Sequence, residues 1–153
     1  MTQSTGAVHE ATIHVRHSQF QLNDYGVVPE LEAEIDGMLV PISGGVLIVC
    51  GISDGPARLR AQACAAEPAP ETSRWDEVAE TTFYAPVGDI RVVPLFDNPV
   101  PEIPPLTSGP GAYRVRVYAR GRDIARNRFV ESPTEEYFLQ VWPAGAGAEP
   151  TSR

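Results

Sequence analysis

The sequence predicts an all-β protein, an antiparallel β-sandwich or a partly open barrel of about eight strands. Three observations support this fold class. Apolar and charged side chains alternate at residues 30–36 and 113–120, as they do on a strand that is buried on one face. No segment of ten or more residues has helical periodicity. Short apolar segments recur at intervals of roughly 8–15 residues with glycine and proline between them, as in antiparallel sandwiches.

Residues 1–9 are polar and are predicted to be disordered. The candidate strands after them alternate or are apolar throughout, and turn residues bound them. These segments span 11–22, 30–36, 39–42, 46–50, 57–65, 75–84, 90–96, 113–120 and 136–142. The alternation of the first segment blurs at Phe20, which indicates a bulge or a bend there.

The acidic segment 30–36 places its carboxylates on one face and three apolar residues on the other. An Asp-Gly turn separates it from 39–42, a short segment that Pro41 weakens as a strand. The apolar run 46–50 has the composition of a strand buried on both faces. A Ser-Asp-Gly-Pro turn joins it to 57–65, so these two segments are predicted to pair as a hairpin.

The segment 75–84 opens like a capped helical turn, but its Thr-Thr-Phe-Tyr end favours a strand. Residues 97–111 contain five prolines and cannot form a central strand. The clearest strand is 113–120, where arginines alternate with tyrosine, valine and alanine. Its inward residues are predicted to pack with those of 136–142, beyond the charged loop 121–133.

Composition indicates a single domain at 10–143, followed by a flexible tail at 144–153. The 153 residues are 42% hydrophobic. A chain of this length buries roughly 70% of its unfolded surface, so it needs no metal or disulfide to fold. For Cys50 and Cys64, two thiols are favoured over a disulfide. We expect a cytoplasmic protein without membrane contact, because no secretory signal and no run of roughly 18 apolar residues occurs.

The net charge is −8, and all twelve basic residues are arginine. The absence of lysine, together with abundant alanine, proline and glycine, indicates the codon usage of a GC-rich genome rather than a function. An acidic surface repels the phosphates of DNA and RNA and attracts basic proteins. Nucleic acid is therefore not an expected partner.

The main candidate for a binding site is the row of carboxylates in the acidic segment: Glu30, Glu32, Glu34 and Asp36. Such a face attracts and orients a basic protein partner. It is also typical of an edge strand whose charges prevent pairing with other sheets, which is the ordinary reason for such a row. Metal binding is disfavoured, because alternate carboxylates of a strand stand roughly 7 Å apart.

A second charged row consists of Arg114, Arg116 and Arg120. These arginines are expected either to pair with the carboxylates of the acidic segment, across strands or between the ends of the sandwich, or to bind an anion. The three histidines within 9–17 lack the spacing that puts metal ligands on one strand face. No metal site and no cofactor are therefore predicted.

No catalytic residue is predicted, because the sequence lacks a nucleophile elbow, a phosphate-binding loop and a zinc-protease motif. The carboxylates within 76–80 suggest glycoside hydrolysis, but a small sandwich without a cleft disfavours it. A small-ligand or carbohydrate-binding module is the alternative function. It would use exposed aromatic side chains, for which Tyr25, Trp75 and Tyr84 are the candidates.

Two parts of the chain resemble known families. Residues 109–123, GPGAYRVRVYARGRD, and 136–143, EYFLQVWP, are similar to a pattern of uncharacterised actinobacterial β-sandwich proteins, GPGxYRVRVxARGRD with EYxLQxWP. That resemblance implies the fold and no activity. Ser18-Gln19-Phe20 and the strand that opens at Tyr113 resemble the ComJ-like family of competence nuclease inhibitors. This second resemblance implies inhibition of a nuclease.

The sequence as a whole predicts a non-enzymatic, cytoplasmic β-sandwich that binds a basic protein such as a nuclease or a toxin. Its class of function would be that of an inhibitor or immunity-type protein. The acidic net charge and the concentrated carboxylates are the physical reason, since they accelerate encounter with a basic partner.

Overall fold

The computed structural model describes residues 5–71 and 74–145. These residues form nine strands in two sheets and no helix, which confirms the all-β prediction. The described residues accordingly contain no helix long and apolar enough to cross a membrane. The strands are β1 (Thr5–Val15), β2 (Gln19–Asp24), β3 (Leu39–Ile42), β4 (Gly45–Val49), β5 (Gly55–Cys64), β6 (Glu77–Ala85), β7 (Ile90–Pro94), β8 (Gly111–Arg120) and β9 (Glu136–Pro143).

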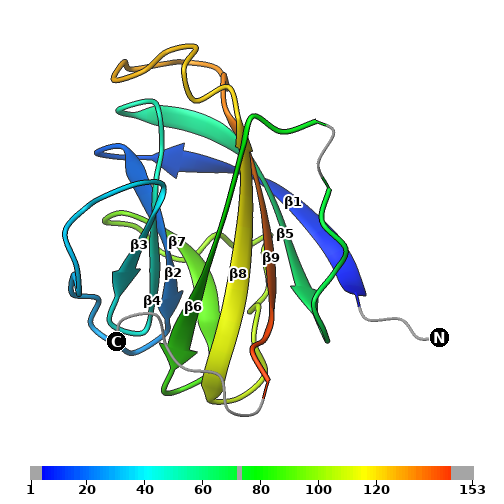
Figure 1. The fold of residues 1–153 in the computed structure, drawn as a ribbon. Helices are drawn as coiled ribbons and strands as arrows, with labels where there is room; N and C mark the ends of the chain where they lie inside the picture. Colours follow the sequence, from blue (N-terminus) through cyan, green and yellow to red (C-terminus); the bar gives the residue numbers. More distant parts are fainter. Residues whose placement is uncertain (1–4, 72–73, 146–153) are drawn as a thin grey trace.

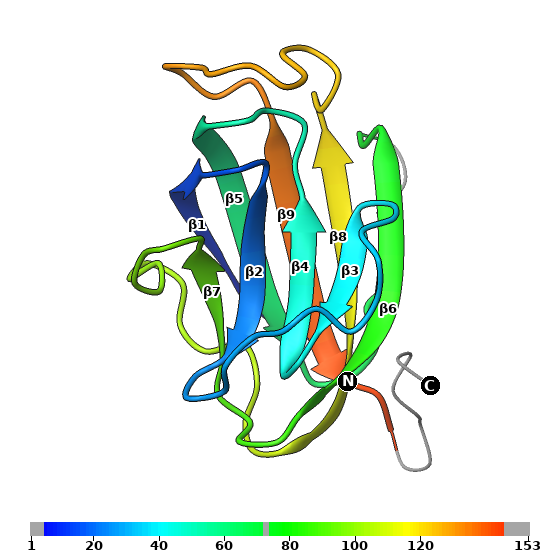
Figure 2. The same ribbon diagram turned by 90° about the vertical axis from the view of Figure 1, so that its left-hand side faces the viewer.

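The two sheets lie face to face, as Figures 1 and 2 show from two sides. The larger sheet has the order β1-β5-β9-β8-β6, and the smaller sheet has the order β3-β4-β2-β7. All neighbouring strands are antiparallel except β5 and β9, which are parallel. At one open side of the sandwich the edge strand β3 contacts the edge strand β6.

The main core fills the space between the sheets with the inward side chains of both. On β8 and β9 these include Val115, Val117, Leu139 and Val141, all completely buried. Val115 is paired with Val141 and Val117 with Leu139, so the inward faces of the two strands coincide. The predicted packing of these four residues is confirmed.

The first predicted strand is two strands in the structure. β1 belongs to the larger sheet and β2 to the smaller one. Between them His17 and Ser18 have positive φ angles of 51° and 60°, which turn the chain from one sheet to the other. The prediction of disorder at residues 5–9 was wrong, because β1 begins at Thr5 and pairs with β5. Residues 1–4 of that prediction lie outside the described residues.

Two further predictions were wrong. The acidic segment 30–36 is a loop rather than a strand, since its one ladder contact is an isolated bridge from Leu31 to Ile42. The strands β4 and β5 do not form a hairpin, because they belong to different sheets. The chain between them crosses from one layer of the sandwich to the other.

The outer face of the larger sheet carries the arginine row of residues 113–120. Residues 67–71 and Trp75 lie across β8 and β9 and cover part of this face. The Glu71 amide donates a hydrogen bond to the Tyr118 hydroxyl at 3.0 Å. The Trp75 ring lies 5.7 Å from the Tyr118 ring and 6.3 Å from the Phe138 ring, between centroids. Both covered aromatic side chains are almost completely buried.

At the C-terminal end, Ala144 and Gly145 are the last described residues of the predicted tail. The Ala144 amide donates to the Ala112 carbonyl at 3.0 Å and so continues the pairing of β9 with β8. The rest of the predicted tail lies outside the described residues.

Candidate functional site

The acidic loop, residues 28–37 between β2 and β3, exposes every one of its side chains. It carries the four predicted partner-binding residues: Glu30, Glu32, Glu34 and Asp36. Among the described residues none of the four has an ion-pair partner. Their negative charge is therefore not neutralised by any cation within residues 5–71 and 74–145.

Backbone hydrogen bonds hold one end of this loop against the edge of the smaller sheet. The Glu32 amide donates to the Pro41 carbonyl at 3.1 Å, and the Ser43 amide donates to the Glu30 carbonyl at 2.9 Å. Both bonds join the loop to β3 and to the turn after it, as the course of the chain in Figure 2 shows. The loop is thus fixed near Glu30 and Glu32, while its carboxylates point to solvent.

Apolar side chains of the acidic loop are exposed as well. Val28, Leu31 and Ile35 expose 72%, 54% and 57% of their surface. The sequence predicted Leu31 and Ile35 on a buried strand face, and this prediction was wrong because the segment has no partner strand to bury it. The loop therefore presents apolar contact area between its charges, which a protein partner could bury.

The arginine row on β8 lies beside carboxylates from other parts of the chain. Arg116 is 3% exposed in its side chain and contacts Glu80 at 2.5 Å and Glu67 at 3.0 Å. Arg114 contacts Glu80 at 2.7 Å, and Arg120 contacts Glu136 at 2.7 Å. The arginines thus pair with acidic residues of the larger sheet and its cover, not with the acidic loop.

Glu80 lies between two of these arginines on the neighbouring strand β6. Burial by itself raises the pKa of a carboxyl group, but the hydrogen bonds from Arg114 and Arg116 outweigh it. The pKa of Glu80 is consequently lowered below its usual value of 4.5. This pair of contacts stabilises the charged form and joins β6 to β8.

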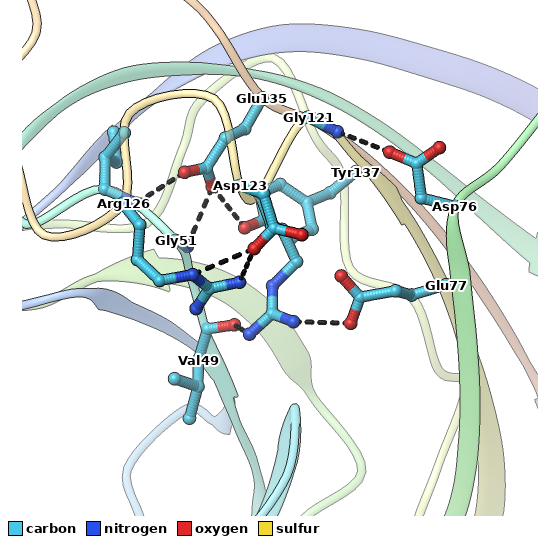
Figure 3. A network of polar contacts seen from close by, with 11 residues as sticks. Val49, Gly51, Asp76, Glu77, Gly121, Asp123, Arg126, Glu135 and Tyr137 are labelled. Atoms are coloured by element: carbon cyan, nitrogen blue, oxygen red, sulfur yellow. Dashed lines mark hydrogen bonds and ion pairs between the residues drawn. The ribbon is translucent and has the colours of Figure 1, made fainter.

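A second polar centre lies at the end of the sandwich that carries the loop between β8 and β9 (Figures 1 and 3). Glu135 is 2% exposed, and its carboxylate accepts hydrogen bonds from the Gly51 amide at 3.1 Å, the Ile52 amide and the Tyr137 hydroxyl. These donors belong to the connection between β4 and β5 and to β9. A single carboxylate therefore holds the two sheets together where the chain crosses between them.

Arg122 supports the same centre. Its guanidinium donates to the Glu77 carboxylate at 2.5 Å and to the Val49 carbonyl at 2.8 Å (Figure 3). Next to it, Asp76 accepts a hydrogen bond from the Gly121 amide at 2.9 Å. The three carboxylates considered for glycoside hydrolysis, those of Asp76, Glu77 and Glu80, are thus all hydrogen-bonded to other parts of the fold.

Burial raises the pKa of the Cys50 thiol and of the Tyr137 hydroxyl, which lie next to Glu135. Both groups are therefore protonated at neutral pH. Tyr137 then acts as a hydrogen-bond donor to the carboxylate rather than as a base. Cys50 and Cys64 are both free and buried.

Sequence reasoning missed a group of exposed apolar side chains at this end of the molecule. Phe96 is 81%, Ile124 70% and Phe129 79% exposed. The ring of Phe96 contacts that of His17 at 5.9 Å, and Phe129 forms a bridge with Asp54. Ile124 and Phe129 belong to the predicted charged loop 121–133, where a single apolar residue gives no signal, and Phe96 stood at the end of the predicted strand 90–96.

The three aromatic residues suggested for carbohydrate binding lie in different surroundings. Trp75 packs on the outer face of the larger sheet. The Tyr25 ring lies under the Arg91 guanidinium at 5.1 Å, and Tyr84 stands on the edge strand β6, half exposed. Among the described residues no three histidine, cysteine or acidic side chains are placed to hold a metal ion.

Comparison with known proteins gives the fold. No protein-family model and no curated protein matches the chain. Among solved structures it is similar to ComJ from Bacillus subtilis, an inhibitor of the DNA degrading activity of NucA, with TM-score 0.57 and 10% identity over 94% of this chain and 100% of that one. It is also similar to the protein titled crocagin biosynthetic gene J, with TM-score 0.53 and 15% identity over 95% and 100%. The likeness to ComJ agrees with the resemblance seen in the sequence, whereas the actinobacterial pattern found no match.

Proposed function

We propose that this protein is a non-enzymatic, cytoplasmic inhibitor-type protein that binds a basic protein, such as a nuclease, through the acidic loop. The observation that carries the proposal is the set of four exposed carboxylates without ion-pair partners among the described residues. Every other cluster of carboxylates described above is engaged in contacts that hold the fold together.

The physical argument is electrostatic. Unpaired carboxylates on one loop attract a basic protein and orient it before contact, which raises the association rate. The exposed apolar residues between them, Leu31 and Ile35, then supply area that a partner can bury. The structural similarity to ComJ supports the same class of function, since that protein inhibits a nuclease.

The test uses two baits, the wild-type protein and a variant in which Glu30, Glu32, Glu34 and Asp36 are all changed to their amides. Both baits are immobilised and exposed to lysate of the source organism at low and at physiological salt. We expect the wild type to capture a basic protein that the variant does not. Capture should weaken with salt, because exposed charges are screened over about 8 Å at physiological ionic strength. The captured protein is then purified, and its activity is measured with and without the wild-type protein.

Two results would contradict the proposal. The first is capture of the same proteins by both baits. The second is a captured partner that is acidic or whose activity the wild-type protein leaves unchanged. Sedimentation of the variant provides the control for the other interpretation, in which the charges only prevent association between sheet edges. An increase in self-association without a change of partners would support that interpretation instead.

A further inference from the structure

A pocket of about 340 Å³ lies beside the acidic loop, between the edge strands of the two sheets. One wall is formed by β3 and the turn after it, including Pro41 and Ile42, and the other by Tyr84 and Pro86 at the end of β6. Its volume is at the low end of the roughly 300–1,000 Å³ typical of ligand pockets. The pocket therefore suits one long side chain rather than a large ligand.

The chemistry of the lining combines apolar walls with one carboxylate. Glu32 of the acidic loop lines the pocket, and its carboxylate accepts a hydrogen bond of 3.4 Å from the Ser43 hydroxyl. Such a long bond satisfies little of the carboxylate's capacity to accept hydrogen bonds. Tyr84 adds an aromatic ring that is half exposed. An apolar stem that ends in a cation is complementary to this combination.

The charges around the pocket favour a cation as well. Arg114 lies nearby and donates to the Thr82 hydroxyl at 2.8 Å, but its charge is balanced by Glu80 at 2.7 Å. On the other side the acidic loop contributes unpaired negative charge at its remaining carboxylates. The described charged groups around the pocket therefore sum to a net negative charge.

We propose that this pocket binds an arginine side chain of the basic protein partner. The inference rests on the proposed function and adds the anchoring residue of the partner. Arginine fits better than lysine, because its planar guanidinium stacks on an aromatic ring and donates two parallel hydrogen bonds to a carboxylate. Arginine is also among the residues that most often dominate binding energy at protein interfaces.

The test needs no partner protein. N-acetyl-arginine amide is titrated into the isotope-labelled protein, and backbone amide shifts are followed by NMR. N-acetyl-citrulline amide, which has a similar shape without the charge, and N-acetyl-lysine amide are titrated in parallel. We expect saturable shifts at Gly44, Gly45 and Tyr84 with the arginine probe, weaker shifts with lysine and none with citrulline.

Four variants define the contacts. Tyr84→Ala should weaken the arginine probe roughly two- to fivefold, the loss expected for one exposed cation–π contact. Glu32→Gln should weaken it further. Glu131→Gln removes the same charge from the loop between β8 and β9, outside the pocket lining and the acidic loop, and Tyr25→Ala removes an exposed tyrosine elsewhere; both should change the affinity less than twofold. Thermal unfolding of each variant confirms that the fold is retained.

Three results would overturn the inference: no saturable shift at the pocket, equal binding of arginine and lysine, or shifts that survive both Glu32→Gln and Tyr84→Ala. These outcomes are separate from the capture experiment. A partner captured through the acidic loop without binding of the arginine probe would leave the proposed function in place and refute the pocket. Binding of the probe without any captured partner would refute the proposed function.

Discussion

Glu135 offers the most demanding test of how the two sheets are held together. Its buried carboxylate accepts three hydrogen bonds, two from backbone amides of the β4–β5 connection and one from Tyr137. The change Glu135→Gln keeps the size and replaces one acceptor oxygen by an amino group. Because all three neighbouring groups are donors, that amino group must face at least one of them without an acceptor.

The expected loss follows from the number of bonds. A hydrogen bond to a charged group contributes about 1.5–3 kcal/mol to stability, and the amide loses one or two of the three. We therefore expect the free energy of unfolding to fall by about 2–5 kcal/mol, a large part of the roughly 5–15 kcal/mol of a typical domain. At a urea dependence of about 2 kcal/mol per molar, the unfolding midpoint should decrease by about 1–2.5 M.

Urea unfolding followed by tryptophan fluorescence measures this change. Glu131→Gln is the matched control, because it lies exposed on the same loop and should alter stability by less than about 0.5 kcal/mol. If Glu135→Gln does not fold, Tyr137→Phe removes a single donor and should cost about 1–2 kcal/mol. A loss below about 1 kcal/mol for Glu135→Gln would refute the reasoning, since the amides would then have found other acceptors.

Three further predictions concern other parts of the fold. Leu139→Ala should lower the free energy of unfolding by about 2–4 kcal/mol, because this side chain is completely buried between the sheets; a loss below about 0.5 kcal/mol in urea unfolding would contradict that placement. The pKa of Glu80 is lowered in the folded protein, so its stabilising contribution is present above its unfolded pKa and lost as the pH falls through the folded value. Thermal unfolding between pH 6 and pH 3 should thus be less steeply pH-dependent in Glu80→Gln, and an unchanged slope would count against the arginine contacts. Native Cys50 should resist alkylation by iodoacetamide at pH 8 until urea unfolds the protein, because burial keeps the thiol protonated and inaccessible; rapid labelling of the folded protein would show that this end opens.

The two alternating segments show what a local pattern can predict. Residues 113–120 and 30–36 have the same period, yet only the first is a strand. The first lies between β6 and β9 and pairs with both along its length. The second meets only β3, which has four residues and includes Pro41, a residue without a backbone donor. Alternation thus predicts which side chains share a face, but it does not show whether a partner strand is available.

The contact partners were the least predictable part. Arg116 was recognised as one of a row, but nothing in the sequence indicates that Glu67 and Pro68 cover it. Glu135 was not singled out at all, since its donor on Gly51 is 84 residues away in the chain. A buried carboxylate is recognised only once the fold brings its donors together. The core of β8 and β9 was predictable because strand periodicity alone determines which residues point inward.

The same limits explain why the acidic loop is the part of the site that the sequence could locate but not describe. As a predicted edge strand, its carboxylates had a structural role available, which was to prevent pairing with other sheets. In the structure the loop's own backbone protects the edge of the smaller sheet. Its hydrogen bonds at Glu30 and Glu32 with β3 and the turn after it occupy backbone groups that another sheet could otherwise pair with. The carboxylates are thereby left without a structural function among the described residues. Like charges on one loop repel one another, and binding a basic protein would offset that repulsion. This is the physical reason to look for the partner at this loop.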